Sequence, residues 1–145
     1  MTRAGAAVVG LLGLAACASG GTGLLRVDAL PSEGPFGEPP ADRLVRAIQL
    51  VAGTERLVCR PGTGGDLLTC SPADLGTRTA QATIHLEPSG SGYRVRLEET
   101  SVPFLRDTAG LCALQRRIAQ AIDLELGVPS AHPDPRGVCG PEQGE

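Results

Sequence analysis

The side chains best suited to covalent, metal or acid–base chemistry are those of five cysteines and two histidines. Cysteine ligands of a structural zinc site typically lie two to four residues apart. After the first cysteine, the spacings here are 11, 42 and 27 positions, and neither histidine lies near a cysteine. We therefore expect no metal site and no cofactor.

His85 is the candidate for acid–base chemistry, because it lies in a segment with strand-like alternation. His85 and Glu87 would share one face of a strand, as a base and its orienting carboxylate must. The alternative is an ordinary solvated surface, and we favour it: we expect no catalysis and a His85 that folding does not require. At most this face contacts a protein partner, through Thr83, His85, Glu87, Arg94 and Arg96.

Other motifs do not favour an enzyme. The glycine-rich run 62–66 lacks the Gly-Lys-Ser/Thr ending of a phosphate-binding loop. Glu98 and Glu99 are adjacent, so on a strand their carboxylates point to opposite faces. His132 lies in a proline-rich tail, where a linker role is expected. The chain is therefore predicted to be no enzyme.

Cys17 has a different setting from the other cysteines. It follows an apolar run from Ala4 to Ala16, with one positive charge, Arg3, in front of the run. This segment resembles a bacterial lipoprotein signal with its lipobox. The resemblance implies that residues 1–16 are removed, that Cys17 is acylated, and that membrane lipid is a partner of the mature chain.

Other interpretations of this segment fit less well. A transmembrane helix needs roughly 20 apolar residues, and three glycines within the run would weaken a core helix. An ordinary signal peptide with an incidental Cys17 is the serious alternative. The lipoprotein interpretation places the protein in a bacterial cell envelope, facing the periplasm or the cell exterior. Ala18, rather than Asp, follows the anchor, so the outer membrane is preferred in a Gram-negative source.

The composition fits one small exported domain. Removing residues 1–16 takes away one of the 13 basic residues, Arg3, and leaves 129 residues with a net charge near −4 (12 basic against 16 acidic). That length is typical of a single domain. The arginines are scattered and form no basic stripe, so nucleic acid is not an expected partner.

Hydrophobic periodicity predicts the secondary structure. After a tether at residues 17–23, a strand is expected over Leu24–Leu30, then a loop in which Phe36 contacts the core. A helix over Ala41–Ala52 follows, with a stop at Gly53, and then a strand over Arg56–Arg60.

The second half predicts a hairpin and a long helix. Residues 67–70 form a short strand or a helical turn. Strict alternation over 80–87 and 93–98, around the turn 88–92, gives an antiparallel pair. Asp107 or Thr108 caps a helix that ends at Gly127, and the proline-rich tail from Ser130 would be loose by itself.

An even number of cysteines in an exported chain is typical of disulfides. Four cysteines permit three connectivities, which sequence alone does not settle, and zinc or free thiols remain alternatives. If residues 62–67 form a loop, Cys59 lies opposite Cys70. We predict that bridge, and a second in which Cys139 ties the tail to Cys112.

The order of these elements resembles the small α/β domains of envelope accessory lipoproteins. These are grouped with the TolB amino-terminal domain, the curli-secretion lipoprotein and penicillin-binding-protein activators. The similarity lies in the pattern: Ser32 follows Leu30-Pro31 where the family pattern has Phe, and the disulfides are a further departure. The resemblance implies assembly or regulation by contact with another envelope protein.

The predicted fold is α+β: one mostly antiparallel sheet of about four to five strands, with two helices on one face and two disulfides. The expected organisation is a signal peptide (1–16), a tether (17–23), the domain (24–129) and a tied-back tail (130–145). The expected function is that of a membrane-anchored accessory, scaffold or assembly protein. The alternative is a small periplasmic ligand-binding module or an enzyme inhibitor.

Overall fold

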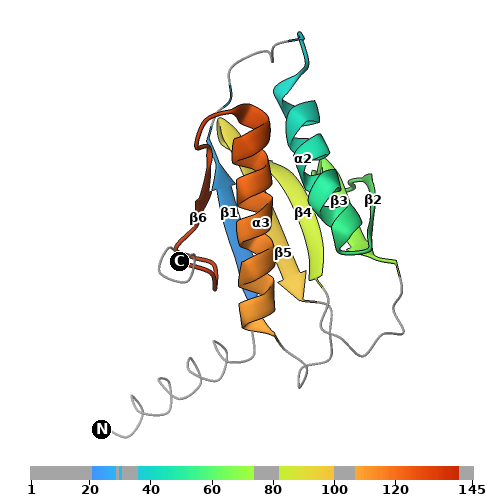
Figure 1. Cartoon of the computed structure of the whole chain (residues 1–145), viewed down its shortest axis with the longest axis vertical. Helices are drawn as coiled ribbons and strands as arrows, with labels where there is room; N and C mark the ends of the chain where they lie inside the picture. The colour runs from blue at the N-terminus through green and yellow to red at the C-terminus, as the bar shows by residue number, and fades with distance from the viewer. Residues whose placement is uncertain (1–20, 29, 31–35, 74–81, 100–106, 141–145) are drawn as a thin grey trace, which may run out of the picture.

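The computed structural model describes residues 21–28, 30, 36–73, 82–99 and 107–140. Within them, six strands form one antiparallel sheet in the order β2-β3-β4-β5-β1-β6, and two helices cover one face of it (Figure 1). This confirms the predicted α+β domain. The elements are β1 (Thr22–Val27), α2 (Pro40–Thr54), β2 (Leu57–Pro61), β3 (Leu68–Pro72), β4 (Ala82–Ser89), β5 (Gly92–Glu99), α3 (Thr108–Leu126) and β6 (Ala131–Pro133).

The core lies between the sheet and the two helices. Ile84 and Leu86 of β4, and Val95 and Leu97 of β5, are buried on the helix side, as their alternation in the sequence predicted. The helices complete this core with Leu44, Ile48, Ile118 and Ile122.

The β4–β5 hairpin is tighter than expected. Ser89 pairs with Gly92, so Gly90 and Ser91 form the turn, and Gly90 adopts a φ of 60°. Such a two-residue turn favours glycine, because it needs positive φ. Pro88 therefore lies in β4. The strand tolerates it because β3 pairs with β4 only as far as Leu86.

Helix α2 continues through the predicted stop at Gly53 and ends at Thr54. The residue with left-handed backbone is Arg56, at φ 58°. The prediction that Phe36 contacts the core is wrong, because this side chain is 88% exposed. An ion pair between Glu38 and Arg46 links the preceding segment to α2 instead.

Helix α3 has the predicted ends. The Asp107 side chain accepts a hydrogen bond from the Gly110 backbone N–H at 2.9 Å, which satisfies one donor of the first turn. Gly127 adopts a φ of 76° and closes the last turn by donating its N–H to Asp123 O.

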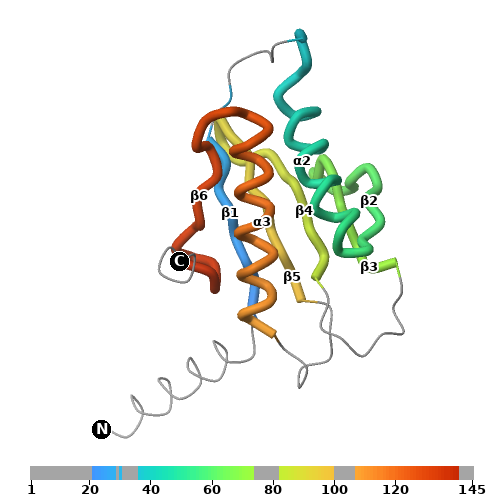
Figure 2. Tube along the Cα trace, in the orientation of Figure 1, coloured from blue at the N-terminus to red at the C-terminus, as the bar shows by residue number. Residues whose placement is uncertain are grey.

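The C-terminal segment adds a strand that was not predicted. Ala131–Pro133 forms β6 and pairs with β1, so the sheet has six strands rather than four or five. Figure 2 shows this segment running beside β1. The start of β1 also differs from the prediction, because the strand begins at Thr22, inside the expected tether.

Both predicted disulfides are present. Cys59 and Cys70 lie directly opposite each other on β2 and β3, with their Cα atoms 3.9 Å apart. Cys112 in the first turns of α3 is bonded to Cys139, which ties the C-terminal segment to the helix.

Candidate functional site

The face of the sheet away from α2 and α3 is covered by no element of the described part of the chain (Figure 1). We call it the open face. The pairing register places His85 opposite Arg96, and Glu87 opposite Arg94, on this face. Thr83 lies opposite Glu98. The five residues predicted to share a face therefore do so.

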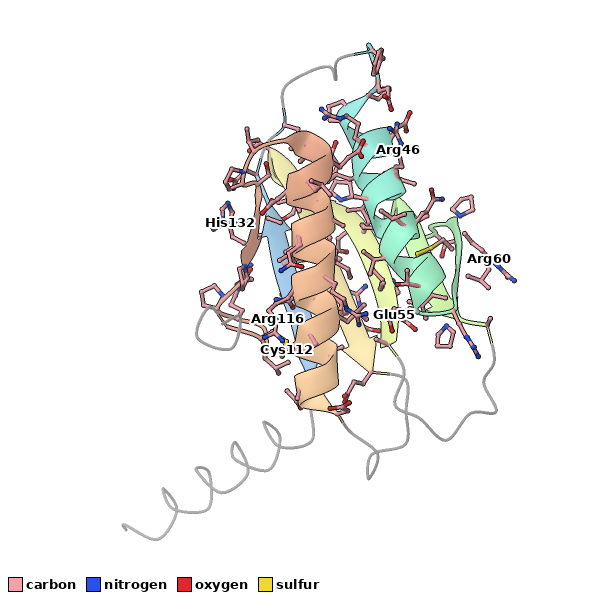
Figure 3. All side chains as sticks on the ribbon, viewed as in Figure 1. Arg46, Glu55, Arg60, Cys112, Arg116 and His132 are labelled. Atoms are coloured by element: carbon pink, nitrogen blue, oxygen red, sulfur yellow. A yellow bond between two sulfur atoms is a disulfide. The ribbon has the colours of Figure 1, made fainter. Side chains whose placement is uncertain are left out.

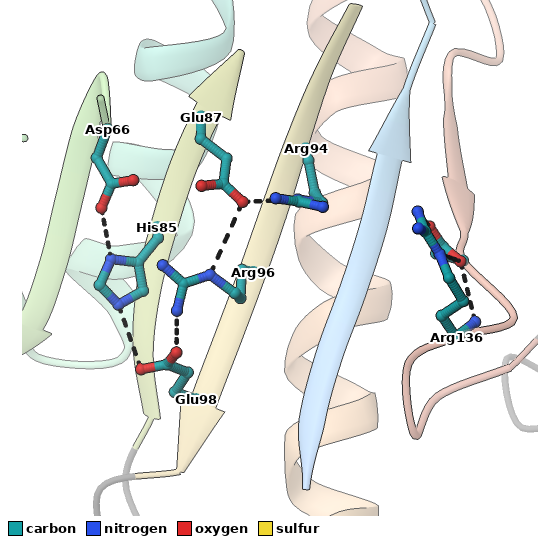
Figure 4. Close-up of polar contacts among 8 residues, drawn as sticks. Asp66, His85, Glu87, Arg94, Arg96, Glu98 and Arg136 are labelled. Atoms are coloured by element: carbon teal, nitrogen blue, oxygen red, sulfur yellow. Dashed lines mark hydrogen bonds and ion pairs between the residues drawn. The ribbon is translucent and has the colours of Figure 1, made fainter. Parts of the chain in front are cut away.

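Polar contacts join most of these side chains into a chain that runs from the turn before β3 across β4 and β5 (Figure 4). Near one end of this chain is His85, whose Nδ1 lies 2.9 Å from Asp66 Oδ2. On the other side of the ring, Nε2 lies 3.6 Å from Glu98 Oε2. We call the connected set the open-face network: Asp66, His85, Glu87, Arg94, Arg96 and Glu98.

Two arginines of β5 extend this network. Arg94 Nε donates to Glu87 Oε1 at 2.6 Å, and Arg96 Nε lies 3.8 Å from the same oxygen. Arg96 also pairs with Glu98 through its Nη1. Glu87 and Glu98 thus each contact an arginine, and Asp66 contacts the His85 ring, so acidic and basic side chains alternate across the face.

Asp66 is the member of the network that sequence reasoning missed. It ends the glycine-rich turn between β2 and β3, and Gly62 lets this turn close because a Cβ there would collide with the Asp66 backbone. The predicted orienting partner of His85 was Glu87, but Asp66 takes that place. In the structure, Thr69 of β3 pairs with His85 of β4. This pairing brings the preceding turn, which contains Asp66, beside the ring.

The network makes His85 less exposed than a freely solvated surface residue. The side chains of His85 and Asp66 are only 16% and 14% exposed. Both ring nitrogens face carboxylates, and within the described residues the ring makes no hydrogen bond to a hydroxyl or a thiol. The geometry therefore suits holding charges in position better than activating a nucleophile.

The cysteines and acids give no further reactive site in the described ranges. Cys59, Cys70, Cys112 and Cys139 are all in disulfides, which removes their thiolates. Among the residues that the structure describes, no group of three or more His, Cys, Asp or Glu side chains is placed to hold a metal ion. Cys17 lies outside the described residues.

A second ionic cluster lies beyond β6. Asp134 accepts hydrogen bonds from the Arg136 side chain, at 2.8 and 3.1 Å, and from the Arg136 backbone N–H. These bonds to the charged form lower the pKa of Asp134 from 3.8 to about 2. Nearby, His132 Nε2 lies 2.9 Å from Asp28 Oδ2 in a more exposed pair.

A small groove lies between α3 and the β1–β6 side of the sheet. Leu25, Ala119 and Pro133 are among the residues that line it, and its volume is about 200 Å³. Typical ligand pockets are about 300–1,000 Å³. Gln115 borders the groove and donates to Cys139 O, but its buried Oε1 has no hydrogen-bond partner. The groove could take only a small ligand.

None of the helices in the described ranges has the length and apolar character needed to cross a bilayer. The chain matches no known protein family, and no curated protein or solved structure matches it significantly. The resemblance to envelope accessory lipoproteins therefore stays a prediction from the sequence pattern.

Proposed function

We propose that this protein is an envelope lipoprotein, anchored by acylated Cys17, that acts by contact with another envelope protein through the open face. The observation that carries the contact part is a sheet face that lies uncovered by described elements and bears a connected set of charges. The anchor part rests on the sequence around Cys17.

The position of β1 supports a membrane-proximal domain. Cys17 precedes Thr22, the first residue of β1, by five positions. A fully extended chain spans at most about 3.5 Å per residue, so this connection reaches roughly 17 Å. A protein anchored in this way works within a short distance of the lipid surface, where its partners would be other envelope proteins.

The open-face network supports a protein contact rather than catalysis. Its side chains hold one another in place, so less conformational entropy is lost when a partner docks. Paired charges of both signs also favour a partner with a complementary pattern over indiscriminate binding.

The anchor is tested by Cys17→Ser, with Ser19→Ala as the matched control in the same tether. The wild type and Ser19→Ala should incorporate a labelled fatty acid and fractionate with membranes, whereas Cys17→Ser should do neither. An unlabelled, soluble wild type would show that the lipoprotein part of the proposal is wrong.

The contact is tested by placing a photo-crosslinking amino acid at Thr83 or Arg94 in intact envelopes. The control position is Leu124 on α3, which is 83% exposed on the helical side of the domain. Both open-face positions should capture the same protein, and Leu124 should not. Capture from Leu124 alone would move the contact to the helices and contradict the proposal.

The alternative function is a small-ligand module, which the groove beside Gln115 favours. The unpartnered Oε1 is an acceptor that a ligand donor could satisfy after a small rearrangement. The low volume of the groove makes ligand binding a weaker candidate than a protein contact. The test is a screen of small amides and alcohols by chemical shift perturbation. Shifts that cluster at Gln115 and Ala119 would support the small-ligand function.

A further inference from the structure

Among the described strands, β2 has a neighbour on one side only, because it ends the strand order of the sheet. The short Cα–Cα distance of 3.9 Å between Cys59 and Cys70 marks a pair without mutual hydrogen bonds. The alternation then directs the N–H and C=O of Val58 and Arg60 to β3. Those of Leu57 and Cys59 point away from it.

Two backbone bonds beyond the strand ends agree with this alternation. Gly62 donates to Leu67 O, and Ala73 donates to Arg56 O, as the even-numbered positions of β2 require. The outward groups of Leu57 and Cys59 have no hydrogen bond to another described residue outside the β2–β3 ladder. The edge therefore offers two donors and two acceptors to a further strand.

The side chains of β2 also lack cover on that side. Leu57 and Cys59 pack against the core but are only partly buried, whereas their counterparts on β3, Pro72 and Cys70, are buried. The difference follows from position, because β3 has a strand on both sides, whereas no strand of the described part of the chain lies beyond β2. An added strand would remove this apolar surface from water.

The other side of β2 belongs to the open face and carries Val58 and Arg60. Val58 is 45% exposed, and Arg60 points away from the sheet into solvent (Figure 3). Arg60 has no carboxylate on β2 and no ion pair with another described residue. A strand laid against β2 would meet one apolar and one cationic side chain, two positions apart.

We propose that the β2 edge accepts an extended segment of the partner protein as a seventh strand, and that an acidic and an apolar side chain of that segment, two positions apart, contact Arg60 and Val58. This is strand addition at a sheet edge, in which backbone bonds supply affinity and alternate side chains supply specificity. The inference rests on the proposed function, because it names how the envelope partner is recognised.

A second copy of this chain fits the edge less well. Two copies joined through β2 would bring both Arg60 side chains, and the neighbouring Arg56 side chains, into one interface. No carboxylate on β2 would offset them, and like charges across strands are destabilising. The cross-strand disulfide also holds β2 in its strand conformation, which suits a rigid template.

The probe is a capped heptapeptide, Thr-Val-Thr-Glu-Thr-Val-Thr, tested against the same peptide with Lys in place of Glu. Valine on both sides of the charge lets it pair in either direction. In the full mature chain, the Glu peptide should slow amide hydrogen exchange at Leu57 and Cys59, and the Lys peptide should bind more weakly.

Charge variants sharpen this test. Arg60→Glu should lower the affinity for the Glu peptide by up to about five-fold, the upper range for an exposed ion pair, and should raise the affinity for the Lys peptide. Arg60→Gln should abolish the discrimination between the two peptides. The matched control is Arg26→Glu, another exposed arginine of the open face, on a strand flanked by β5 and β6.

Three results would overturn the inference: no slowed exchange at Leu57 and Cys59 with either peptide, an equal effect of Arg26→Glu, or a concentration-dependent dimer that protects the same amides. Its failure is separable from that of the proposed function. If Thr83 and Arg94 crosslink to a partner but the peptides protect no amide, the contact through the open face is supported and strand addition at β2 is wrong. If the Glu peptide protects Leu57 and Cys59 but the wild type takes up no labelled fatty acid, the strand-addition proposal stands and the lipid anchor is wrong.

Discussion

The two edges of the sheet are secured in different ways. At one edge, β2 is a regular five-residue strand joined to its neighbour β3 by a short turn and a cross-strand disulfide. At the other, β6 has three residues, ends at Pro133, and is bonded through the C-terminal segment to α3. Short strands discourage further pairing. A terminal proline does not separate the two edges, because β2 also ends in one, Pro61. The comparison shows one edge closed by the chain and the other left available.

Polar contacts also help to hold each edge. The turn next to β2 is joined to β4 by Asp66 and His85. The segment after β6 is held in its turn by Asp134 and Arg136, while Asp134 N–H donates to Leu24 O of β1. Variants at the two disulfides, at His85 and at Asp134 would remove these contacts one at a time.

The largest effect is expected for the bridge at the β6 edge. Replacing Cys112 and Cys139 together by alanine should lower the free energy of unfolding by about 3.5 kcal/mol, from the loop entropy of a bridge that spans 27 positions. Urea denaturation measures this loss. Amide exchange at Val138, whose N–H donates to Thr22 O, should quicken in the same variant. A loss below about 1 kcal/mol would mean that β6 is held without the bridge.

The bridge at the β2 edge should count for less. Cys59→Ala with Cys70→Ala should cost about 2.8 kcal/mol, because this bridge spans 11 positions. The same urea experiment serves, with the other double variant as its matched control. If the loss of the Cys59–Cys70 bridge lowers the free energy of unfolding more than the loss of the Cys112–Cys139 bridge, local packing at β2, and not loop length, determines the difference.

A smaller loss is expected for His85→Ala, about 1 kcal/mol, since it removes a hydrogen bond between two mostly buried side chains. His132→Ala is the matched control, because its ring is also 2.9 Å from a carboxylate but more exposed. That variant should change stability by less than about 0.5 kcal/mol. Equal losses would show that burial of the Asp66 contact contributes nothing.

The last expected effect depends on pH. The pKa of Asp134 is lowered from 3.8 to about 2 in the folded protein, so its ionised form is favoured there. The stability that this gives is full above about pH 4 and is lost as the pH falls toward 2. Asp134→Asn should therefore melt below the wild type at pH 7, and the gap should close at pH 2. Arg136→Gln should behave similarly, and a gap that persists at pH 2 would point to a cause other than ionisation.

The sequence predicted the parts of the fold that depend on local pattern. The alternation around Ile84 and Val95 and the caps at Asp107 and Gly127 are properties of neighbouring residues, and each agrees with the structure. The disulfides followed from these elements, since Cys59 and Cys70 flank one turn.

What was missed depends on partners far away in the chain. Ala131–Pro133 shows no alternation long enough to indicate a strand, and it becomes one because β1 lies beside it. Asp66 is unremarkable in a glycine-rich turn until β3 and β4 pair and bring His85 within 2.9 Å. Such contacts are set by tertiary packing, which local propensity does not encode.

The strand order has a consequence for how the protein assembles. The β2–β3 and β4–β5 hairpins join neighbours along the chain, whereas β1 lies between β5 and β6. Leu25 thus pairs with Val95 on one side and with Pro133 on the other. Pairings of such high sequence separation form slowly. Strand β1 must therefore wait for β5 before it can pair on one side, and for β6 before it can pair on the other.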